Sequence, residues 1–232
     1  MVSFDSPFYP YERVTAENTL KGAELVPMKL LRYLLDLPDA EGYTPVDDNS
    51  RPRVRFAKYL WYDGEDPLSQ PLPTPQEKLS LLYDPKHPDV NTDEEKADHP
   101  KGYRLLWQRV RQQSVTEAQT LVKCYFGRIF NPRPFLTVMG VTWEIWVASG
   151  FETNLATEVY SRSFAIEQCI REALAGVNLT GIGAVSFDRT EHAGNGSENI
   201  YNQGSMTGRL LGCSISWSDA GENVTNGMCW EC

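Results

Sequence analysis

The chain has 232 residues, a formal net charge of −9 at pH 7 and a sequence pI of about 4.9. A field of this sign repels phosphate groups, so the composition argues against a protein that grips free DNA or RNA. Hydrophobic residues make up 41% of the chain, which suffices for a real core. No apolar run reaches the roughly eighteen residues of a membrane-spanning helix, so we expect no membrane partner.

Composition divides the chain into three parts, which we expect to form one structural domain overall. These are an arm and helix over residues 1–48, a Pro-rich and acidic insertion with extended segments over 49–119, and a core over 120–232. In the first part, VPMKLLRYLLDLPD predicts an extended N-terminal helix, because Leu30, Leu31 and Leu34 form an apolar stripe. Pro27 suits the first turn of this helix, and Pro38 ends it.

The insertion holds eight of the fifteen prolines, all between residues 49 and 101. Within it, Val54, Phe56 and Leu60 favour a strand in RPRVRFAKYLWYD. DPKHPDVNTDEEKADHPK predicts a long acidic loop, and such loops usually serve a function or contact a partner. We therefore expect Pro67 to Lys101 to contact another subunit or another partner protein rather than its own core. The acidic candidates for a subunit interface are Asp84, Asp93, Glu94 and Glu95.

A basic run follows the acidic loop and is the exception to the overall charge. Its residues include Lys101, Arg104, Arg109 and Arg111. One interpretation is a face that pairs with acidic loops of a neighbouring subunit. The other is a band that contacts phosphate in the lumen of a ring, with an affinity that falls steeply with salt.

The part from residue 120 onward predicts an α+β fold with the order β-β-α-β-β, in which an antiparallel or mixed sheet packs against one main helix. Strands are expected over 120–130, 135–149, 184–189 and 207–219, which are rich in β-branched and aromatic residues. The helix carries Ile166 and Ile170 on its apolar face and ends at Gly176. Its start is left open among three candidate N-caps, Thr153, Asn154 and Thr157.

Two tryptophans of the second core strand fall on opposite faces, because side chains alternate along a strand. Trp143 and Trp146 cannot both lie in the core unless both faces of the sheet are covered. An extra layer or a neighbouring subunit must cover the second face, so both residues are candidates for a subunit interface.

No catalytic constellation, metal site or phosphate loop emerges from the sequence. The acidic loop between His87 and His99 matches no calcium or zinc spacing, and a solvated loop is the simpler interpretation. GIG at 181–183 precedes a strand, whereas a dinucleotide site needs it between strand and helix. Asp188, Glu191 and His192 keep a metal-dependent nuclease open as an alternative, although strand-end charges explain them as well. We expect no enzyme, cofactor or metal site.

The segments GVTWEIWVAS, FETN, SRSFAIEQCIREALAG, VNLTGIG, AVSFDR and GRLLGCSISWSD follow one another between Thr120 and Asp219. In element order and residue character this region resembles the tail-terminator family of tailed bacteriophages, the neck-ring proteins at the head-proximal end of the tail. The long N-terminal half departs from the smaller members of that family. Another neck, collar or head-completion protein therefore stays open as the alternative.

The resemblance implies a virion protein, assembled in the host cytoplasm, that forms a homohexameric ring. Such a ring docks on the tail tube protein and joins it to the head connector or stopper protein. Genomic DNA passes through the lumen without sequence-specific contact. An acidic lumen fits this role, because like charge discourages phosphate from binding.

Overall fold

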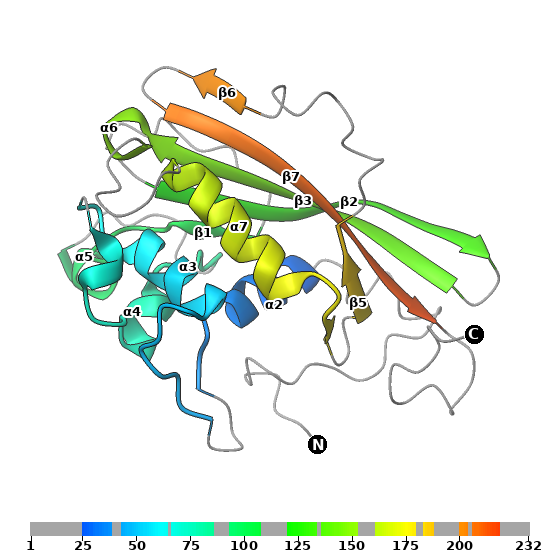
Figure 1. Ribbon diagram of the computed structural model, residues 1–232, viewed down its shortest axis with the longest axis horizontal. Coiled ribbons are helices and arrows are strands. Elements are labelled where there is room, and N and C mark those ends of the chain that lie inside the picture. Colours follow the sequence, from blue (N-terminus) through cyan, green and yellow to red (C-terminus); the bar gives the residue numbers. More distant parts are fainter. Residues whose placement is uncertain are drawn as a thin grey trace.

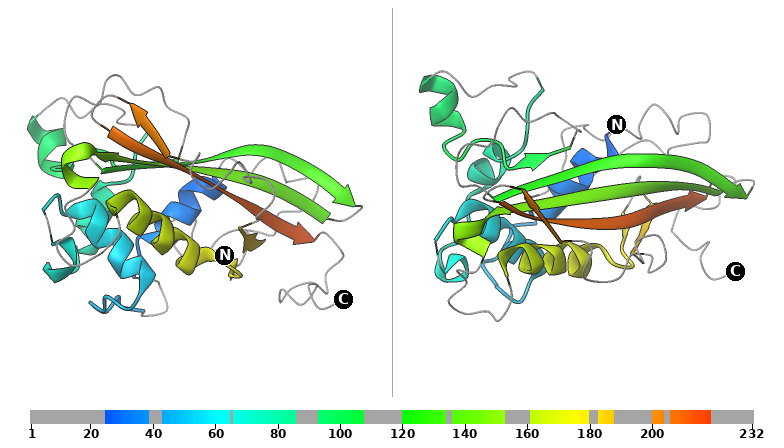
Figure 2. Two further views of the ribbon diagram at one scale, coloured as in Figure 1. Left: turned by 45° about the horizontal axis from the view of Figure 1, so that its top comes forward. Right: turned by 90° about the horizontal axis from the view of Figure 1, so that it is seen from above.

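The computed structural model describes residues 25–38, 43–64, 66–85, 93–107, 120–133, 136–152, 161–179, 183–187, 200–203 and 206–218. It is a mixed α+β fold, in which a curved sheet is packed against helices (Figure 1). In the left view of Figure 2, the three longest helices lie on the same side of the sheet. The coarse fold class predicted from the sequence is therefore confirmed.

Three long antiparallel strands form the centre of the sheet: β2 (Thr120–Arg133), β3 (Leu136–Ala148) and β7 (Met206–Ser218). Four short strands complete it: β1 (Leu105–Leu106), β4 (Asn178–Leu179), β5 (Gly183–Ser186) and β6 (Ile200–Gln203). The sheet order is β1-β2-β3-β7-β5-β4, and β6 also pairs with β7. Among the paired strands of the described residues, only β1 and β2 run parallel.

Six α-helices and one 3₁₀ turn are described, and the longest is α7 (Arg162–Leu174). The others are α2 (Val26–Leu34), α3 (Pro52–Trp61), η1 (Pro67–Ser69), α4 (Pro75–Ser80), α5 (Asp93–Asp98) and α6 (Ser149–Glu152). α7 packs on β3 and β7, α3 lies beside α7, and α2 packs on β2 and α3. The order predicted for residues 120–232 was one helix and four strands. The structure adds α6, β4 and β6 to this region.

The alternation of β3 explains why only one face of the sheet carries the core. One face of the strand buries Met139, Val141, Trp143, Ile145 and Val147, which share one hydrophobic cluster with residues of α2, α3 and α7. The opposite face of β3 carries Thr142, Glu144 and Trp146, which are partly exposed. We call this second face the open face.

The predicted packing of the main helix, with Ile166 and Ile170 towards the core, is confirmed. The helix starts later than the predicted N-caps. Ile166 and Ile170 are fully buried, and Gly176 takes the positive φ of 71° that favours glycine after the last turn. The helix begins at Arg162, and the Ser161 hydroxyl accepts a hydrogen bond from Phe164 N. The three predicted N-caps lie outside the described residues.

The strand predicted around Val54 and Phe56 is wrong, because this segment is helix α3. Pro52 stands in its first turn, where a missing N–H costs nothing. The helix is buried from Phe56 to Trp61 between its neighbours, so its apolar residues run all round it and show no helical period.

The expectation that Pro67 to Lys101 avoids its own core is also wrong in part. Leu81 and Leu82 belong to the hydrophobic cluster, and Leu82 bridges Leu105 next to the sheet. Backbone hydrogen bonds from Arg104 and Leu105 to the Leu81 carbonyl fix this segment in place. The acidic loop after Tyr83 is therefore anchored to the body at both of its described ends.

The end of the β2–β3 hairpin extends beyond the described helices (Figure 1). We call the described residues of this end, 127–133 and 136–139, the distal arm. A register shift between Phe126 and Ile129 marks its base. Phe126, at the base, is one of three large hydrophobic side chains among the described residues that are exposed, with Val46 and Leu79.

Candidate subunit interface

The two tryptophans of β3, Trp143 and Trp146, differ in burial. Trp143 is fully buried in the core, and its indole Nε1 lies 3.3 Å from the Cys213 Sγ. It is therefore a core residue of its own chain, and its assignment to a subunit interface is wrong. Trp146 lies on the open face with partial exposure, and its place in an interface stays a prediction.

Around Trp146, the open face is organised by one carboxylate. Glu144 accepts hydrogen bonds from the Tyr125 hydroxyl at 2.6 Å and from the Trp146 indole at 3.2 Å, and Lys123 lies 3.5 Å away. Burial alone would raise the pKa of Glu144, but these bonds and the lysine charge outweigh it and lower the pKa. The carboxylate therefore stays ionised and holds an aromatic pair in fixed positions.

A glycine on the neighbouring strand gives Trp146 its place. Gly208 pairs with Trp146 across the β3–β7 ladder. A Cβ at Gly208 would lie 2.5 Å from the indole ring, so the ring lies directly over this residue. In the sequence, the only signal of this contact is a glycine within a strand. Such a glycine indicates that another group approaches the backbone closely, but it does not identify that group.

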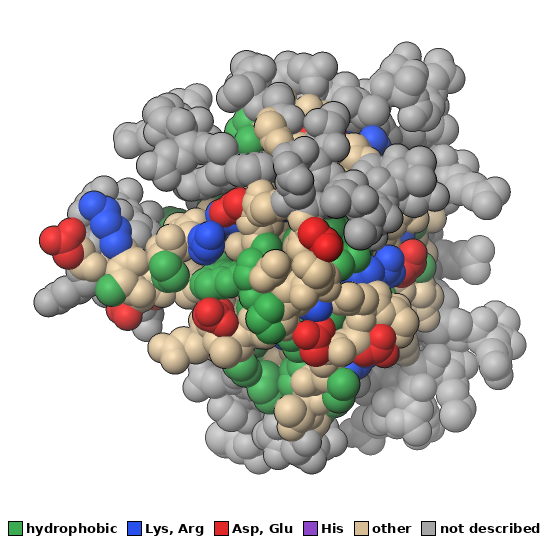
Figure 3. Space-filling model, turned by 60° about the vertical axis from the view of Figure 1, so that its left-hand side comes forward, with side chains coloured by type: hydrophobic (Ala, Val, Ile, Leu, Met, Phe, Trp, Pro, Cys, Tyr) green, Lys and Arg blue, Asp and Glu red, His purple; other side chains and the backbone are tan. Residues whose placement is uncertain are grey.

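The acidic candidates lie towards one end of the molecule. Asp93 begins helix α5 and is exposed, whereas Asp84 and Glu95 are partly buried. The side chain of Glu94 lies outside the described residues. In Figure 3, acidic, basic and apolar side chains of the described residues are interspersed on the face shown.

The basic candidates do not form the expected band within the described residues. Arg104 is 3% exposed and forms a two-pronged pair with Asp63, while it also donates to the Leu60 carbonyl at 2.6 Å. The prediction that Arg104 lies in a lumen or interface is therefore wrong. Arg104 is an internal residue that holds the end of α3, and we call this arrangement the clamp. Arg109 and Arg111 lie outside the described residues, and for them the prediction stands untested.

A second buried arginine, which sequence reasoning missed, completes this clamp. The guanidinium of Arg162 donates to the carbonyls of Tyr59, Tyr62 and Gly64, with 2.6 Å to Tyr62. These carbonyls lie at the C-terminal end of α3, where unsatisfied acceptors and the helix dipole favour a cation. Together Arg104 and Arg162 fasten α3 to the sheet and to α7.

A third polar centre, also missed, ties the N-terminal helix to the insertion. Asp36 is fully buried just after α2, with a positive φ of 50°. Its carboxylate accepts a bond from the Tyr43 hydroxyl at 2.8 Å and pairs with Arg53 at 2.9 Å. Lys78 of α4 donates to its carbonyl at 3.1 Å.

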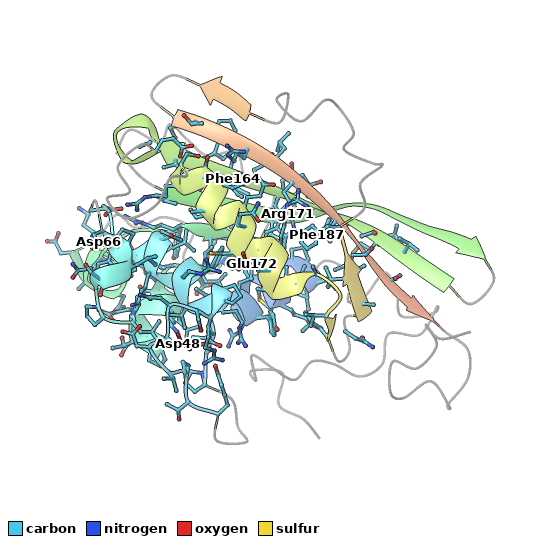
Figure 4. The ribbon with its side chains drawn as sticks, in the orientation of Figure 1. Asp48, Asp66, Phe164, Arg171, Glu172 and Phe187 are labelled. Atoms are coloured by element: carbon cyan, nitrogen blue, oxygen red, sulfur yellow. The ribbon has the colours of Figure 1, made fainter. Side chains whose placement is uncertain are left out.

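Charged and aromatic side chains line the side of α7 that faces β7 and the end of β5, and Figure 4 labels Phe164, Arg171 and Phe187 among them. Arg209 of β7 lies over the Phe164 ring, and Arg171 lies over the Phe187 ring. Glu167 contacts both arginines, at 3.5 Å and 3.0 Å. Of these contacts, only the Glu167–Arg171 pair had a signal in the sequence, its four-residue spacing.

One serine of the described residues is hydrogen-bonded to a carboxylate inside the fold. Ser163 is fully buried, donates its hydroxyl to the Glu152 carboxylate and accepts from Arg209 at 2.8 Å, so its hydroxyl is held inside the fold. Within the described part of the chain, no group of three or more potential ligands could hold a metal ion. The nuclease-like residues Asp188, Glu191 and His192 lie outside that part.

Among the described residues, no helix combines the length and apolar character needed to cross a membrane. We compared the chain with models of protein families, with curated proteins and with solved structures, and none of them matches.

Proposed function

We propose that the chain is a structural virion protein of a tailed bacteriophage, a tail terminator that assembles into a ring in the neck. In this role the ring caps the tail tube, joins it to the head connector and lets DNA pass through its lumen. The proposal also assigns to the chain the β-β-α-β-β core of that family. The succession β2, β3, α7, β5 and β7 along the chain supports it.

The observation that carries the proposal is the distal arm. Its strands continue the sheet past the helices that cover the core, and the exposed Phe126 lies at its base. An exposed aromatic side chain such as Phe126 gains stability when another element covers it. A neighbouring subunit supplies that cover in a ring.

The open face gives a second, weaker argument for assembly. Glu144 fixes Tyr125 and Trp146 in one arrangement, and Trp146 lies over Gly208. Fixed, partly exposed aromatic residues are enriched where proteins contact one another, because they bury a large area with little loss of entropy.

Sedimentation velocity of the purified protein over a range of concentrations tests the proposal. We expect a species close to six times the chain mass of 26.3 kDa. A closed ring of another copy number favours the alternative, another neck, collar or head-completion protein. A monomer at every concentration contradicts the proposal.

A further inference from the structure

The open face carries an indole ring that lies flat on the sheet. A Cβ at Gly208 would lie 2.5, 2.6 and 2.7 Å from three adjacent atoms of the six-membered ring of Trp146, Cζ3, Cε3 and Cη2. One side of the ring is therefore in contact with the backbone of β7. Trp146 is nevertheless partly exposed, so its exposure comes from the ring edge and from the side that faces away from the sheet.

Hydrogen-bonding groups of opposite charge lie beside this ring. Glu144 stands two residues before Trp146 on β3, so the two side chains share the open face about 7 Å apart along the strand. The side chain of Glu144 is 18% exposed, and that of Lys123, 3.5 Å away, is 17% exposed. A carboxylate accepts hydrogen bonds and an ammonium group donates them, so a ligand meets both functions next to the indole.

The charges of this pair cancel, and the balance decides which ligands fit. Glu144 is ionised, because its hydrogen bonds and the nearby lysine lower its pKa, and Lys123 supplies the opposite charge. A phosphate group finds no uncompensated cation in the pair, and a cationic ligand is repelled by Lys123. The pair therefore disfavours both a nucleic acid and a basic peptide, and it suits a neutral polar molecule.

We propose that this part of the open face binds a neutral carbohydrate. The C–H groups on one side of a pyranose ring pack against the outer side of the Trp146 indole, because the face of an aromatic ring carries partial negative charge. Sugar hydroxyl groups donate to Glu144 and accept from Lys123, since a hydroxyl group does both. An apolar platform with a few polar groups in fixed positions is the usual composition of a small-molecule site.

The platform is held in place by its own chain. The Trp146 indole donates to Glu144 at 3.2 Å, and the Tyr125 hydroxyl donates to the same carboxylate at 2.6 Å. The two carboxylate oxygens have about four acceptor sites, so Glu144 can accept further hydrogen bonds from a ligand. Because these side chains are already ordered, a sugar binds them with little additional loss of side-chain entropy.

This inference goes beyond the proposed ring and does not depend on it. A sugar on Trp146 assigns this side chain to a ligand instead of a subunit interface, and the ring then depends on contacts elsewhere, such as those at Phe126. Sedimentation velocity measures the ring and glycan binding measures the site, so the failure of one is distinguishable from the failure of the other.

The first measurement applies the labelled full chain to an array of neutral, sialylated and sulfated oligosaccharides. We expect binding to at least one neutral oligosaccharide, and titration calorimetry with that compound then gives its affinity in solution. This affinity should change little between about 0.1 M and about 1 M salt, because the ligand carries no charge to be screened. Binding to no neutral oligosaccharide, or to acidic ones alone, overturns the inference.

Variants of the platform locate the site. We expect Trp146→Ala to weaken binding of that oligosaccharide about tenfold or more, because it removes the stacking surface, and Trp146→Phe to keep part of the affinity. Glu144→Gln should also weaken binding, since hydrogen bonds to a charged acceptor are the stronger ones. Phe164→Ala is the matched control: it removes a partly exposed aromatic ring on the helix side of the sheet and leaves binding unchanged.

Circular dichroism verifies that each variant is folded. Equal affinities of the wild type and Trp146→Ala would place the sugar elsewhere and overturn the inference. Loss of self-association in Trp146→Ala, with no glycan bound by the wild type, would identify the open face as a subunit contact. That result overturns the sugar site and supports the ring.

Discussion

Lys29 shows how a single buried charge opposes folding in this protein. It is 6% exposed on α2, and burial lowers its pKa from 10.5 to about 6. The charged form is therefore penalised in the folded state. Below pH 6 the full penalty applies, and it is relieved as the pH rises towards 10.5, because the unfolded chain then binds more protons than the folded chain.

We expect Lys29→Met to stabilise the fold and to remove this part of the pH dependence. For the wild type, Lys29 contributes a rise in unfolding free energy of at most about 1.4 kcal/mol per pH unit between pH 6 and 10.5. Urea denaturation of both proteins at several pH values isolates the contribution, because other groups cancel in the difference. Parallel pH curves for the two proteins would show that Lys29 is not desolvated.

Gly208 and Trp146 form a coupled pair. A Cβ at position 208 would approach the indole ring to 2.5 Å, so the ring must move. We expect Gly208→Ala to cost about 1–3 kcal/mol of stability, as other overpacking substitutions do. Combined with Trp146→Ala the cost of the glycine substitution should disappear, and a double-mutant cycle measures this coupling. Additive effects would contradict the placement of the ring.

At the scale of elements, the clamp on α3 is the feature that joins the insertion to the core. Arg162 donates to three backbone carbonyls at the end of α3. Removal of its guanidinium takes away all three of these hydrogen bonds. We expect Arg162→Ala to cost about 2–5 kcal/mol, since it leaves buried acceptors unpaired and opens a cavity. Arg171→Ala, on the outer side of the same helix, should cost well under 1 kcal/mol. Equal costs for the two would show that α3 does not depend on the clamp.

The packing of α7 gives a matched prediction for the core. Ile170 is fully buried, so Ile170→Ala should cost about 2–5 kcal/mol in chemical denaturation. Glu172→Ala, on the exposed side of α7, changes the same helix and should cost far less.

The acidic loop is an element that the body should tolerate losing. Tyr83 and His99 both pack against Tyr103, with ring centroids 5.3 Å and 4.7 Å from it. Deletion of Asp84 to Asp98 should therefore leave the subunit folded and weaken its assembly. Cooperative unfolding at the wild-type midpoint, together with a lower oligomer fraction, is the expected result. Global unfolding of the deletion variant would place the loop within the core.

The sequence predicted the parts of the fold whose local pattern and burial agree. β3 alternates because one of its faces is buried, and α7 keeps a helical period because only one side meets the sheet. α3 was not predicted, because neighbours on several of its sides bury apolar residues all round the helix. Its sequence therefore lacks the 3.6-residue period of apolar positions. β1, β4 and β6 are two to four residues long, too short for any pattern to show.

The candidate site was harder to predict than the fold. Trp143 and Trp146 have the same residue type, and only the register of the sheet decides which one is buried. Arg104 looked like part of a basic run until its partner Asp63, forty-one positions away, came into contact with it. Long-range pairs of this kind leave no local signal, and the same holds for Asp36 with Arg53.

At the scale of the whole molecule, net charge bears on the relation to DNA. We expect passage rather than grip, because a net charge of −9 repels phosphate. Titration with duplex DNA at two salt concentrations measures this, with each neutralised phosphate adding about −0.9 to the slope of log affinity against log salt. Submicromolar affinity at physiological salt, abolished jointly by Arg109→Glu and Arg111→Glu, would instead support a basic lumen band.

The central claim is that copies of this chain close into a ring, and images of the purified protein test it most directly. Class averages from electron microscopy should show closed rings of six copies around a hole wide enough for duplex DNA. Open filaments, symmetric dimers or isolated monomers under conditions where the protein is folded would contradict the claim.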